Sequence, residues 1–229
     1  MVKNNPKVAL CFSGLVGNLD KYGQGEKIDI KGPFEYNKKH ILDKNDVDIF
    51  IHTWSTEEKD NLINLYKPRD YTIEKQIDFG QNSTRNNAIH SKCYSVMKSI
   101  ELKKKYEKEN NFKYDFVMIF RFDSVFLVDL NFSEFDNDYF WCGANNQNST
   151  EHIDDQWFFS NSKNIDTISN LYNEISDIET VSPTNSPHRY WKIYLQKTGL
   201  DKMCKYKFDM DNTRFADYCI FRFMENENV

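Results

Sequence analysis

The stretch from Asp115 to Leu127 (DFVMIFRFDSVFL) constrains the fold most strongly. Its first half is apolar at both odd and even positions, which is typical of a strand buried on both faces of a parallel sheet. The apolar run then meets Arg121 and Asp123. A charged pair at the end of a buried strand is costly without partners, and ligands of open α/β sheets lie at the carboxyl ends of strands. Asp123 is therefore the first candidate for a functional carboxylate, and an Arg–Asp ion pair that only closes the strand is the equal alternative.

The segments around this stretch predict the class of fold. Residues 7–12 and 46–51 are two further apolar segments of strand length, and a long helix with a buried stripe, residues 86–109, leads directly into the strand at residue 115. A helix that runs straight into a buried strand indicates parallel strands with right-handed crossovers. We therefore expect an α/β fold, a Rossmann-like domain whose mostly parallel central sheet is flanked by helices.

The rest of the chain is divided by turn and cap residues into shorter elements. The pattern predicts Asn86 or Asn87 as the cap of the long helix and Ser162 as the cap of a later one. The other expected helices are 33–43, 55–66, 162–177 and 189–198, and the other expected strands are 71–77, 138–143, 203–208 and 218–223. No linker or repeat divides the chain, so we expect one domain over residues 1–229, with its core at about 7–200 and C-terminal strands in 201–229.

Composition narrows the class of partner. Hydrophobic residues make up 39% of the 229 residues and aromatic residues 15%, which is enough for a sizeable core. The net charge of −5 argues against general binding of nucleic acid. The basic run Lys103–Lys105 shares its helix with several glutamates, so we interpret it as a solvated helix face.

The cysteines and the N-terminus point to a reducing compartment. The five cysteines are odd in number and form no C-x-x-C pair, so we expect reduced, buried thiols and a cytoplasmic location: Cys11, Cys93, Cys142, Cys204 and Cys219. The first six residues do not have the pattern of a signal peptide. No segment approaches the roughly 18 apolar residues of a membrane span, so any membrane contact is expected to be peripheral.

Polar clusters follow several of the expected strands. Ser13-Gly14, His52-Thr53-Trp54 and Arg121-x-Asp123 each come at a strand end, and Asp154-Asp155 follows about 30 residues later. Carboxylates suit Mg²⁺ or Mn²⁺ bridged to a diphosphate, and such an ion stabilises a departing nucleotide diphosphate. A second carboxylate can take the proton of an attacking hydroxyl. This is the chemistry of sugar transfer from a nucleotide sugar.

The order of these pieces resembles GT-A-fold glycosyltransferases, in particular small bacterial and viral enzymes that build surface glycans. The matching pieces span residues 7–200 and read ALCFSG, DIFIHTW, SKxYS, YDFVMIFRFDSVF and DDQWFFS. The chain departs from the usual D-x-D motif of the family because Arg121 stands where the first Asp would be. The resemblance then implies that Asp123 alone keeps the metal-binding role, and it leaves a metal-weak or metal-independent site open.

The resemblance also implies a nucleotide-sugar site. Ser13, Gly14 and Asn18 would lie under the nucleotide, although a plain tight turn is an equal interpretation because the glycines lack a phosphate-loop spacing. Trp54 would flank the base, with a buried core tryptophan as the favoured alternative. Lys92, with Arg121 and Asp123, would contact the diphosphate, and a solvated lysine fits position 92 equally well.

Catalytic roles are implied for the later carboxylates. Asp155 is expected to be the general base, with Asp154 as its helper or as a ligand of the acceptor, and an exposed turn pair is the alternative. Adjacent carboxylates raise each other's pKa, which favours a base near neutral pH. His188 would join Asp123 as a metal ligand, because related folds supply a late histidine, while a surface histidine is as good an interpretation.

The expected function is therefore metal-assisted transfer of a hexose or pentose, from a donor that by family habit is UDP-linked, to a hydroxyl of a glycan acceptor. An inverting course is favoured over a retaining one, and Mn²⁺ or Mg²⁺ is the expected cofactor. Two other classes stay open. One is a non-catalytic module that binds glycan or nucleotide sugar, and the other is a metal-dependent nucleotidyltransferase or phosphohydrolase. The donor, the acceptor and the oligomeric state are not indicated.

Overall fold

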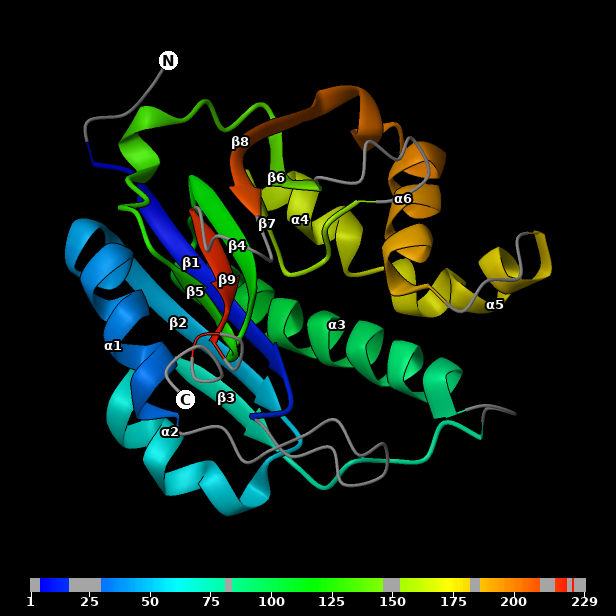
Figure 1. The fold of residues 1–229 in the computed structure, drawn as a ribbon, viewed down its shortest axis with the longest axis horizontal. Coiled ribbons are helices and arrows are strands. Elements are labelled where there is room, and N and C mark those ends of the chain that lie inside the picture. Colours follow the sequence, from blue (N-terminus) through cyan, green and yellow to red (C-terminus); the bar gives the residue numbers. More distant parts are fainter. Residues whose placement is uncertain are drawn as a thin grey trace.

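The strand at the centre of the sequence is also at the centre of the molecule. In the computed structural model, β4 (Phe116–Arg121) lies inside the main sheet, between β1 (Lys7–Gly14) and β7 (Trp157–Ser160) (Figure 1). Its residues from Phe116 to Phe120 are all buried. The prediction of an interior strand buried on both faces is confirmed.

The structure describes residues 5–16, 30–80, 84–145, 153–181, 186–210, 217–221 and 224. Within these residues the main sheet has seven strands in the order β3-β2-β1-β4-β7-β6-β8, and β5 pairs with β9 in a second, two-stranded sheet. The strands not yet given are β2 (Asp46–Thr53), β3 (Asp70–Ile73), β5 (Ser124–Phe126), β6 (Phe140–Asn145), β8 (Cys204–Met210) and β9 (Tyr218–Ile220).

One strand of the main sheet, β7, runs against all the others. β3, β2, β1 and β4 are parallel to one another, with Ser13 opposite Arg121 at the end of the β1–β4 pair. β7 runs antiparallel to both β4 and β6, and β6 is parallel to β8. The expected mostly parallel α/β fold is confirmed, with β7 as the reversed strand.

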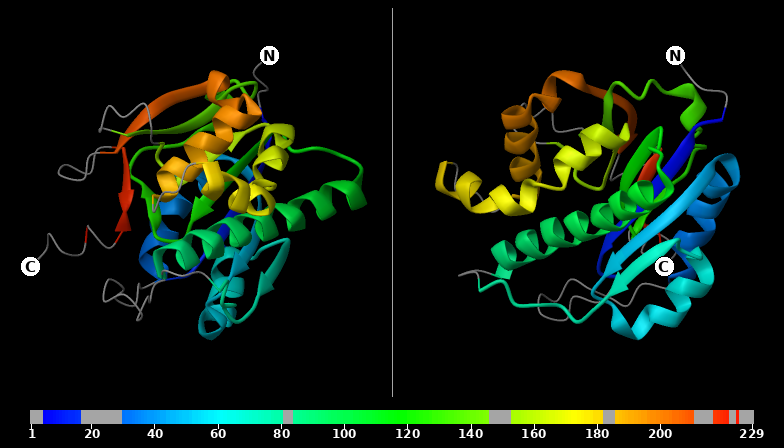
Figure 2. Two further views of the ribbon diagram at one scale, coloured as in Figure 1. Left: turned by 90° about the vertical axis from the view of Figure 1, so that its right-hand side faces the viewer. Right: turned by 180° about the vertical axis from the view of Figure 1, so that it is seen from behind.

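Helices cover both faces of the sheet (Figures 1 and 2). α1 and α2 lie on one face, and the long α3 crosses the other face with α4, α5 and α6 beyond it. Their bounds are α1 (Lys31–His40), α2 (Lys59–Tyr66), α3 (Thr84–Asn110), α4 (Ser162–Ile168), α5 (Leu171–Val181) and α6 (Pro187–Thr198). Among the described residues, no helix has both the length and the apolar character that a membrane crossing requires.

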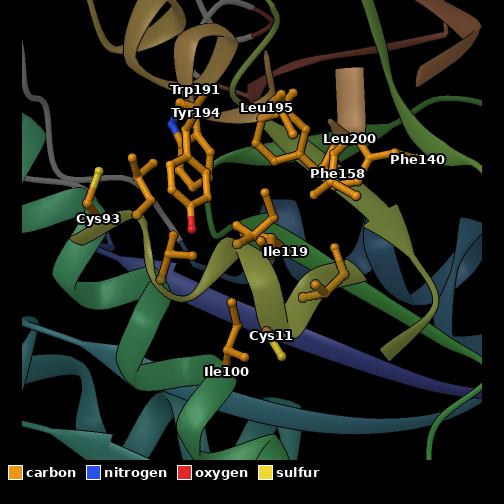
Figure 3. Close-up of a cluster of buried hydrophobic side chains, with 14 of the residues drawn as sticks. Cys11, Cys93, Ile100, Ile119, Phe140, Phe158, Trp191, Tyr194, Leu195 and Leu200 are labelled. Atoms are coloured by element: carbon orange, nitrogen blue, oxygen red, sulfur yellow. The ribbon is translucent and has the colours of Figure 1, made fainter. Parts of the chain in front are cut away.

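Alternate residues of the strands feed two separate hydrophobic cores. In β1, Ala9 and Cys11 face the core under α3 and α6, whereas Val8, Leu10 and Phe12 face the core under α1 and α2. Figure 3 shows the first core, in which Trp191 and Tyr194 of α6 join side chains of the sheet and of α3. The two-sided burial of the strands follows from this three-layer arrangement.

Several expected boundaries are corrected by the structure. The helix expected over residues 33–43 ends at His40, and the strand expected over 71–77 ends at Ile73. The helix expected over residues 162–177 is two helices, α4 and α5. The side chain of Asn161, rather than Ser162, accepts the capping hydrogen bond from the amide of Asn164.

The long helix also begins earlier than expected. Because α3 starts at Thr84, Asn86 and Asn87 lie inside its first turn, and the side chain of Asn87 accepts a hydrogen bond from the amide of Phe79 at 2.9 Å. The predicted buried stripe is confirmed at Ile89, Cys93, Val96 and Ile100.

One charged residue of this helix is not on a solvated face. Lys103 is 0% exposed and donates hydrogen bonds to Glu107, Ser162 and Asp166. The interpretation of Lys103–Lys105 as a solvated run is therefore wrong at its first position, because Lys103 has acidic partners inside the protein.

The five cysteines are free thiols, and all but the half-buried Cys204 are buried.

Candidate functional site

The candidate site lies where β1 and β4 run side by side. From β1 the sheet continues through β2 and β3 in one direction, and β4 lies on the opposite side, so the chain order reverses between β1 and β4. Ligands of open α/β sheets bind outside the carboxyl ends of strands at such a reversal. Ser13-Gly14 and Arg121 end the two strands at this edge.

Arg121 and Asp123 form a planar, two-bonded ion pair at this edge. Arg121 Nε donates to Asp123 Oδ1 at 2.8 Å, and its terminal nitrogen donates to Oδ2 at 2.6 Å. The Arg121 side chain is 30% exposed and that of Asp123 is 8% exposed. Burial opposes the charge of Arg121, but Asp123, Asp155 and Asp154 raise its pKa above the ordinary value. Arg121 is thus the partner that a ligand meets, with Asp123 held beneath it.

The reversed strand β7 brings the second carboxylate pair to the same place. Phe120 of β4 lies opposite Trp157 of β7, and the two strands are antiparallel. The residues just before Trp157 therefore lie beside the residues just after Phe120. Asp154 and Asp155 are both buried in this position. The exposed turn that was the alternative for this pair does not fit their burial.

Asp155 is surrounded by cationic groups. Lys92 of α3 forms an ion pair with Asp155 Oδ2, and its Nζ also donates to the carbonyl oxygen of Asp155 at 2.8 Å. His188, in the first turn of α6, has its Nδ1 at 3.4 Å from Asp155 Oδ1. Burial would raise the pKa of Asp155, but the charges of Lys92, His188 and Arg121 outweigh it and lower the pKa below its ordinary value.

Asp154 has different surroundings. The hydroxyl of Tyr218 donates to Asp154 Oδ2, and the amide of Gln156 donates to Oδ1 at 3.1 Å. Burial raises the pKa of Asp154, and the adjacent charge of Asp155 adds to the rise, against the two hydrogen bonds. The expectation that neighbouring carboxylates raise each other's pKa therefore describes Asp154 and not Asp155.

Gly143 makes room for the contact between Tyr218 and Asp154. A Cβ atom at position 143 would lie 1.9 Å from the Tyr218 hydroxyl oxygen and 2.8 Å from Asp154 Oδ2. Both distances are shorter than real Cβ contacts allow. Any larger residue at position 143 would therefore displace this pair.

The donor atoms of Asp154, Asp155 and His188 form a group that can take a metal ion. One ligand atom of each lies within 4.8 Å of the others. Carboxylate oxygens with one imidazole nitrogen are a donor set that suits Mn²⁺. His188 was expected to join Asp123, but the structure places it beside Asp155, and Asp123 is not part of this group.

Two of the predicted nucleotide-contacting segments lie near this edge: the Ser13-Gly14 turn at the end of β1, and Trp54 just after β2. Ser13 is buried, and Gly14 has a positive φ of 99° with its amide donating to Ser95 Oγ at 2.7 Å. Trp54 is buried and stacks on Tyr94 with ring centroids 5.4 Å apart. This burial agrees with the alternative of a core tryptophan at position 54. Asn18 lies outside the described residues.

A Ser–His–Glu arrangement lies behind Gly14. His52 Nδ1 is 2.7 Å from Ser95 Oγ, and its Nε2 is 3.0 Å from Glu74 Oε1. Such a set resembles a nucleophile with its base and orienting acid. However, Ser95 is 0% exposed, and its hydroxyl donates to the carbonyl of His52 at 3.2 Å. We interpret the set as a support that holds the turn at Gly14.

The sequence reasoning did not identify Tyr218, Gly143 or the Ser95–His52 pair as parts of the site. Tyr218 and Asp154 are 64 residues apart in the chain, and nothing in the short strand around Tyr218 indicates which strand it joins. Ser95 appeared only inside the SKxYS piece, without a role. Comparison of the chain with models of known protein families and with curated proteins finds no match.

Proposed function

We propose that this protein transfers a sugar from a nucleotide-diphosphate sugar to a hydroxyl of a glycan acceptor. The observation that supports the proposal is the meeting of Arg121–Asp123 after β4 with Asp154 and Asp155 before β7. They meet at the carboxyl ends of the parallel strands, where the order of the sheet reverses. A strand-end site with both cations and carboxylates suits an anionic donor and a proton-accepting step.

The cationic groups account for the binding of the donor in this proposal. Arg121 is the more exposed member of its ion pair, and its planar guanidinium matches two phosphate oxygens at once. Lys92 of α3 is a second cation, paired with Asp155. A diphosphate at this edge would meet positive charge from β4 and α3 together.

A divalent ion is the cofactor that we propose for this site. Asp155 and His188 would hold it, in place of the predicted pair of Asp123 and His188, with Asp154 beside them. When bound, Mn²⁺ or Mg²⁺ supplies positive charge to the leaving nucleotide diphosphate. Asp123 then acts through Arg121, whose guanidinium it orients.

The two buried carboxylates suit different roles. Asp155 was expected to be the base, but its cationic neighbours hold it in the charged form and make it a weak proton acceptor. Asp154, whose pKa is raised by burial, is closer to the range that a general base needs near neutral pH. We therefore propose that Asp154 accepts the proton of the acceptor hydroxyl and that Asp155 stays negatively charged.

The experiment that tests this proposal measures release of free nucleotide. The full chain is incubated with a panel of nucleotide sugars, each with and without glycan acceptors and with Mn²⁺ or EDTA. Acceptor-dependent release of a nucleoside diphosphate supports sugar transfer. Binding of a nucleotide sugar without release would instead support a non-catalytic module. Hydrolysis to a nucleoside monophosphate and a sugar phosphate would support a phosphohydrolase, and formation of a nucleoside triphosphate and a sugar phosphate when pyrophosphate is added would support a nucleotidyltransferase.

One observation favours the non-catalytic class as the second candidate. Both oxygens of Asp123 accept hydrogen bonds from Arg121, and Asp155 already has Lys92 as a partner. Carboxylates whose oxygens already have partners inside the protein can simply hold cationic side chains in place, and those side chains can then bind a ligand without any reaction. The same panel separates this class, because a binding module retains affinity and shows no turnover.

A further inference from the structure

The Lys92 side chain is in direct contact with the carboxylate of Asp155, which is also a candidate metal ligand. Its Nζ binds the carboxylate Oδ2 and the main-chain carbonyl oxygen of the same residue. We propose that Lys92 and a divalent ion compete for Asp155, so that the ion binds only when Lys92 leaves. This inference rests on the metal role proposed for Asp155 and His188.

The burial of Asp155 explains why the two cations exclude each other. The Asp155 side chain is 5% exposed, and that of Lys92 is 22% exposed. Charges in contact in such a place interact strongly, because little water screens them. An ion on Asp155 would meet the charge of Arg121 as well as that of Lys92, since both contribute positive charge there. Lys92 is the cation that contacts Asp155 directly. Its side chain is flexible, so it can move away from the carboxylate.

The competition has a consequence for the donor. Lys92 lies on α3 and Arg121 ends the interior strand β4, and both act on the carboxylate of Asp155. An ammonium displaced by the ion carries its charge away from Asp155 and toward solvent at the same edge. It is then available to phosphate oxygens, so the ion and the diphosphate should bind cooperatively in the native chain.

The test measures binding of Mn²⁺ alone, by titration calorimetry, to the full chain and its variants. Lys92→Met keeps an unbranched side chain without charge, and we expect it to bind Mn²⁺ at least about tenfold more tightly than the native chain. Adding Asp155→Asn to Lys92→Met should abolish that gain. Lys105→Met is the matched control, because Lys105 also pairs with an acid on another element, Asp70, but is remote from the site. Its affinity should equal that of the native chain.

Unchanged or weaker Mn²⁺ binding by Lys92→Met would overturn the proposal, as would a gain that survives Asp155→Asn. Lys92→Gln, which keeps a hydrogen-bond donor without the charge, gives a second measurement if the methionine variant does not fold. No nucleotide sugar enters this titration. The competition between Lys92 and Mn²⁺ can therefore be confirmed even if the protein transfers no sugar. If the protein transfers sugar but shows no such competition, only the further inference fails.

Discussion

At the scale of single residues, Arg121 carries the exposed charge of the site, and Asp123 fixes the orientation of its guanidinium. Two parallel hydrogen bonds hold the guanidinium plane in one orientation. Asparagine offers one acceptor oxygen and a competing NH₂ group, so Asp123→Asn should turn Arg121 away from its present plane. We expect this variant to weaken binding of UDP at least about tenfold, which is about 1.4 kcal/mol.

Arg121→Lys distinguishes orientation from charge in the same titration. A lysine keeps the charge but cannot make two parallel bonds, so a loss close to that of Asp123→Asn would assign the effect to orientation. If both variants bind UDP as tightly as the native chain, this ion pair only closes the strand. That was the alternative left open by the sequence.

The contrast between Asp154 and Asp155 also belongs to the residue scale. We expect Asp154→Asn to lower turnover by about 10²-fold or more, since a positioned carboxylate contributes on that order to proton transfer. Turnover of the native chain should fall as the pH drops through the raised pKa of Asp154, because the protonated acid cannot accept a proton. Asp155→Asn should instead weaken Mn²⁺ binding. Loss of turnover by Asp155→Asn with native Mn²⁺ affinity would restore Asp155 as the base.

At the scale of elements, the short strand β9 connects both carboxylate regions. Its Tyr218 binds Asp154, and the amide of Phe221 just beyond its end donates to the carbonyl oxygen of Asp123 at 2.8 Å. β9 pairs with β5, which directly follows Asp123 in the chain. The strand therefore holds the ends of β4 and the start of β7 in a fixed relation.

The contribution of β9 can be measured through Tyr218→Phe. Removing the hydroxyl leaves a buried carboxylate oxygen without its donor, so we expect a loss of about 1.5–3 kcal/mol in unfolding free energy and a fall in turnover. Tyr194→Phe is the control, because Tyr194 is also buried but donates to a neutral carbonyl, that of Thr167, outside the site. It should cost less stability and leave turnover unchanged. Equal effects of the two variants in urea unfolding and in turnover would remove β9 from the site.

Local patterns predicted some elements well and others poorly, for physical reasons. The run Phe116–Phe120 is apolar at every position, and this alone indicates a strand covered on both faces. The two-helix region after Ser162 has a continuous apolar stripe, and periodicity does not report the break at Ser169 and Asn170. β9 has three residues, too few for a pattern, and its partner β5 lies more than ninety positions earlier in the chain.

At the scale of the whole molecule, the site depends on one reversal of strand direction. Strand ends at Gly14 and Arg121 could be expected at one edge from the parallel pattern alone. Asp154 and Asp155 precede their strand, and in an all-parallel sheet they would lie at the opposite edge. Only the antiparallel β7 places them beside Arg121, and no local feature of WFFS indicates that direction. The candidate residues were thus predictable, whereas their convergence required the tertiary structure.

The opposite end of the molecule depends on a buried charge network that the sequence concealed. Glu107 accepts hydrogen bonds from Lys103 and Lys113 on one oxygen and from Ser162 and the amide of Tyr114 on the other. These contacts join α3 to the start of α4 and to the segment that enters β4. Lys103 and Glu107 both have side chains that are 0% exposed. Removing one partner of such a pair leaves the other charge buried and costs about 3–5 kcal/mol.

This network predicts how stability depends on pH. Burial would raise the pKa of Glu107, but its bonds to Lys113 and Ser162 and the charge of Lys103 lower it below the ordinary value of 4.5. Because the folded-state pKa is below the unfolded one, Glu107 stabilises the fold above pH 4.5, and this contribution is lost as the pH falls further.

Urea unfolding at a series of pH values tests this dependence with Glu107→Gln. The variant should lose about 3 kcal/mol at pH 7 and change less than the native chain between pH 5 and pH 3. Glu101 is exposed and pairs with Lys98 on the same helix, so Glu101→Gln should stay within about 0.5 kcal/mol of the native chain. If Glu107→Gln and the native chain lose stability in parallel as acid is added, other carboxylates govern acid unfolding, and the network contributes through packing rather than through charge.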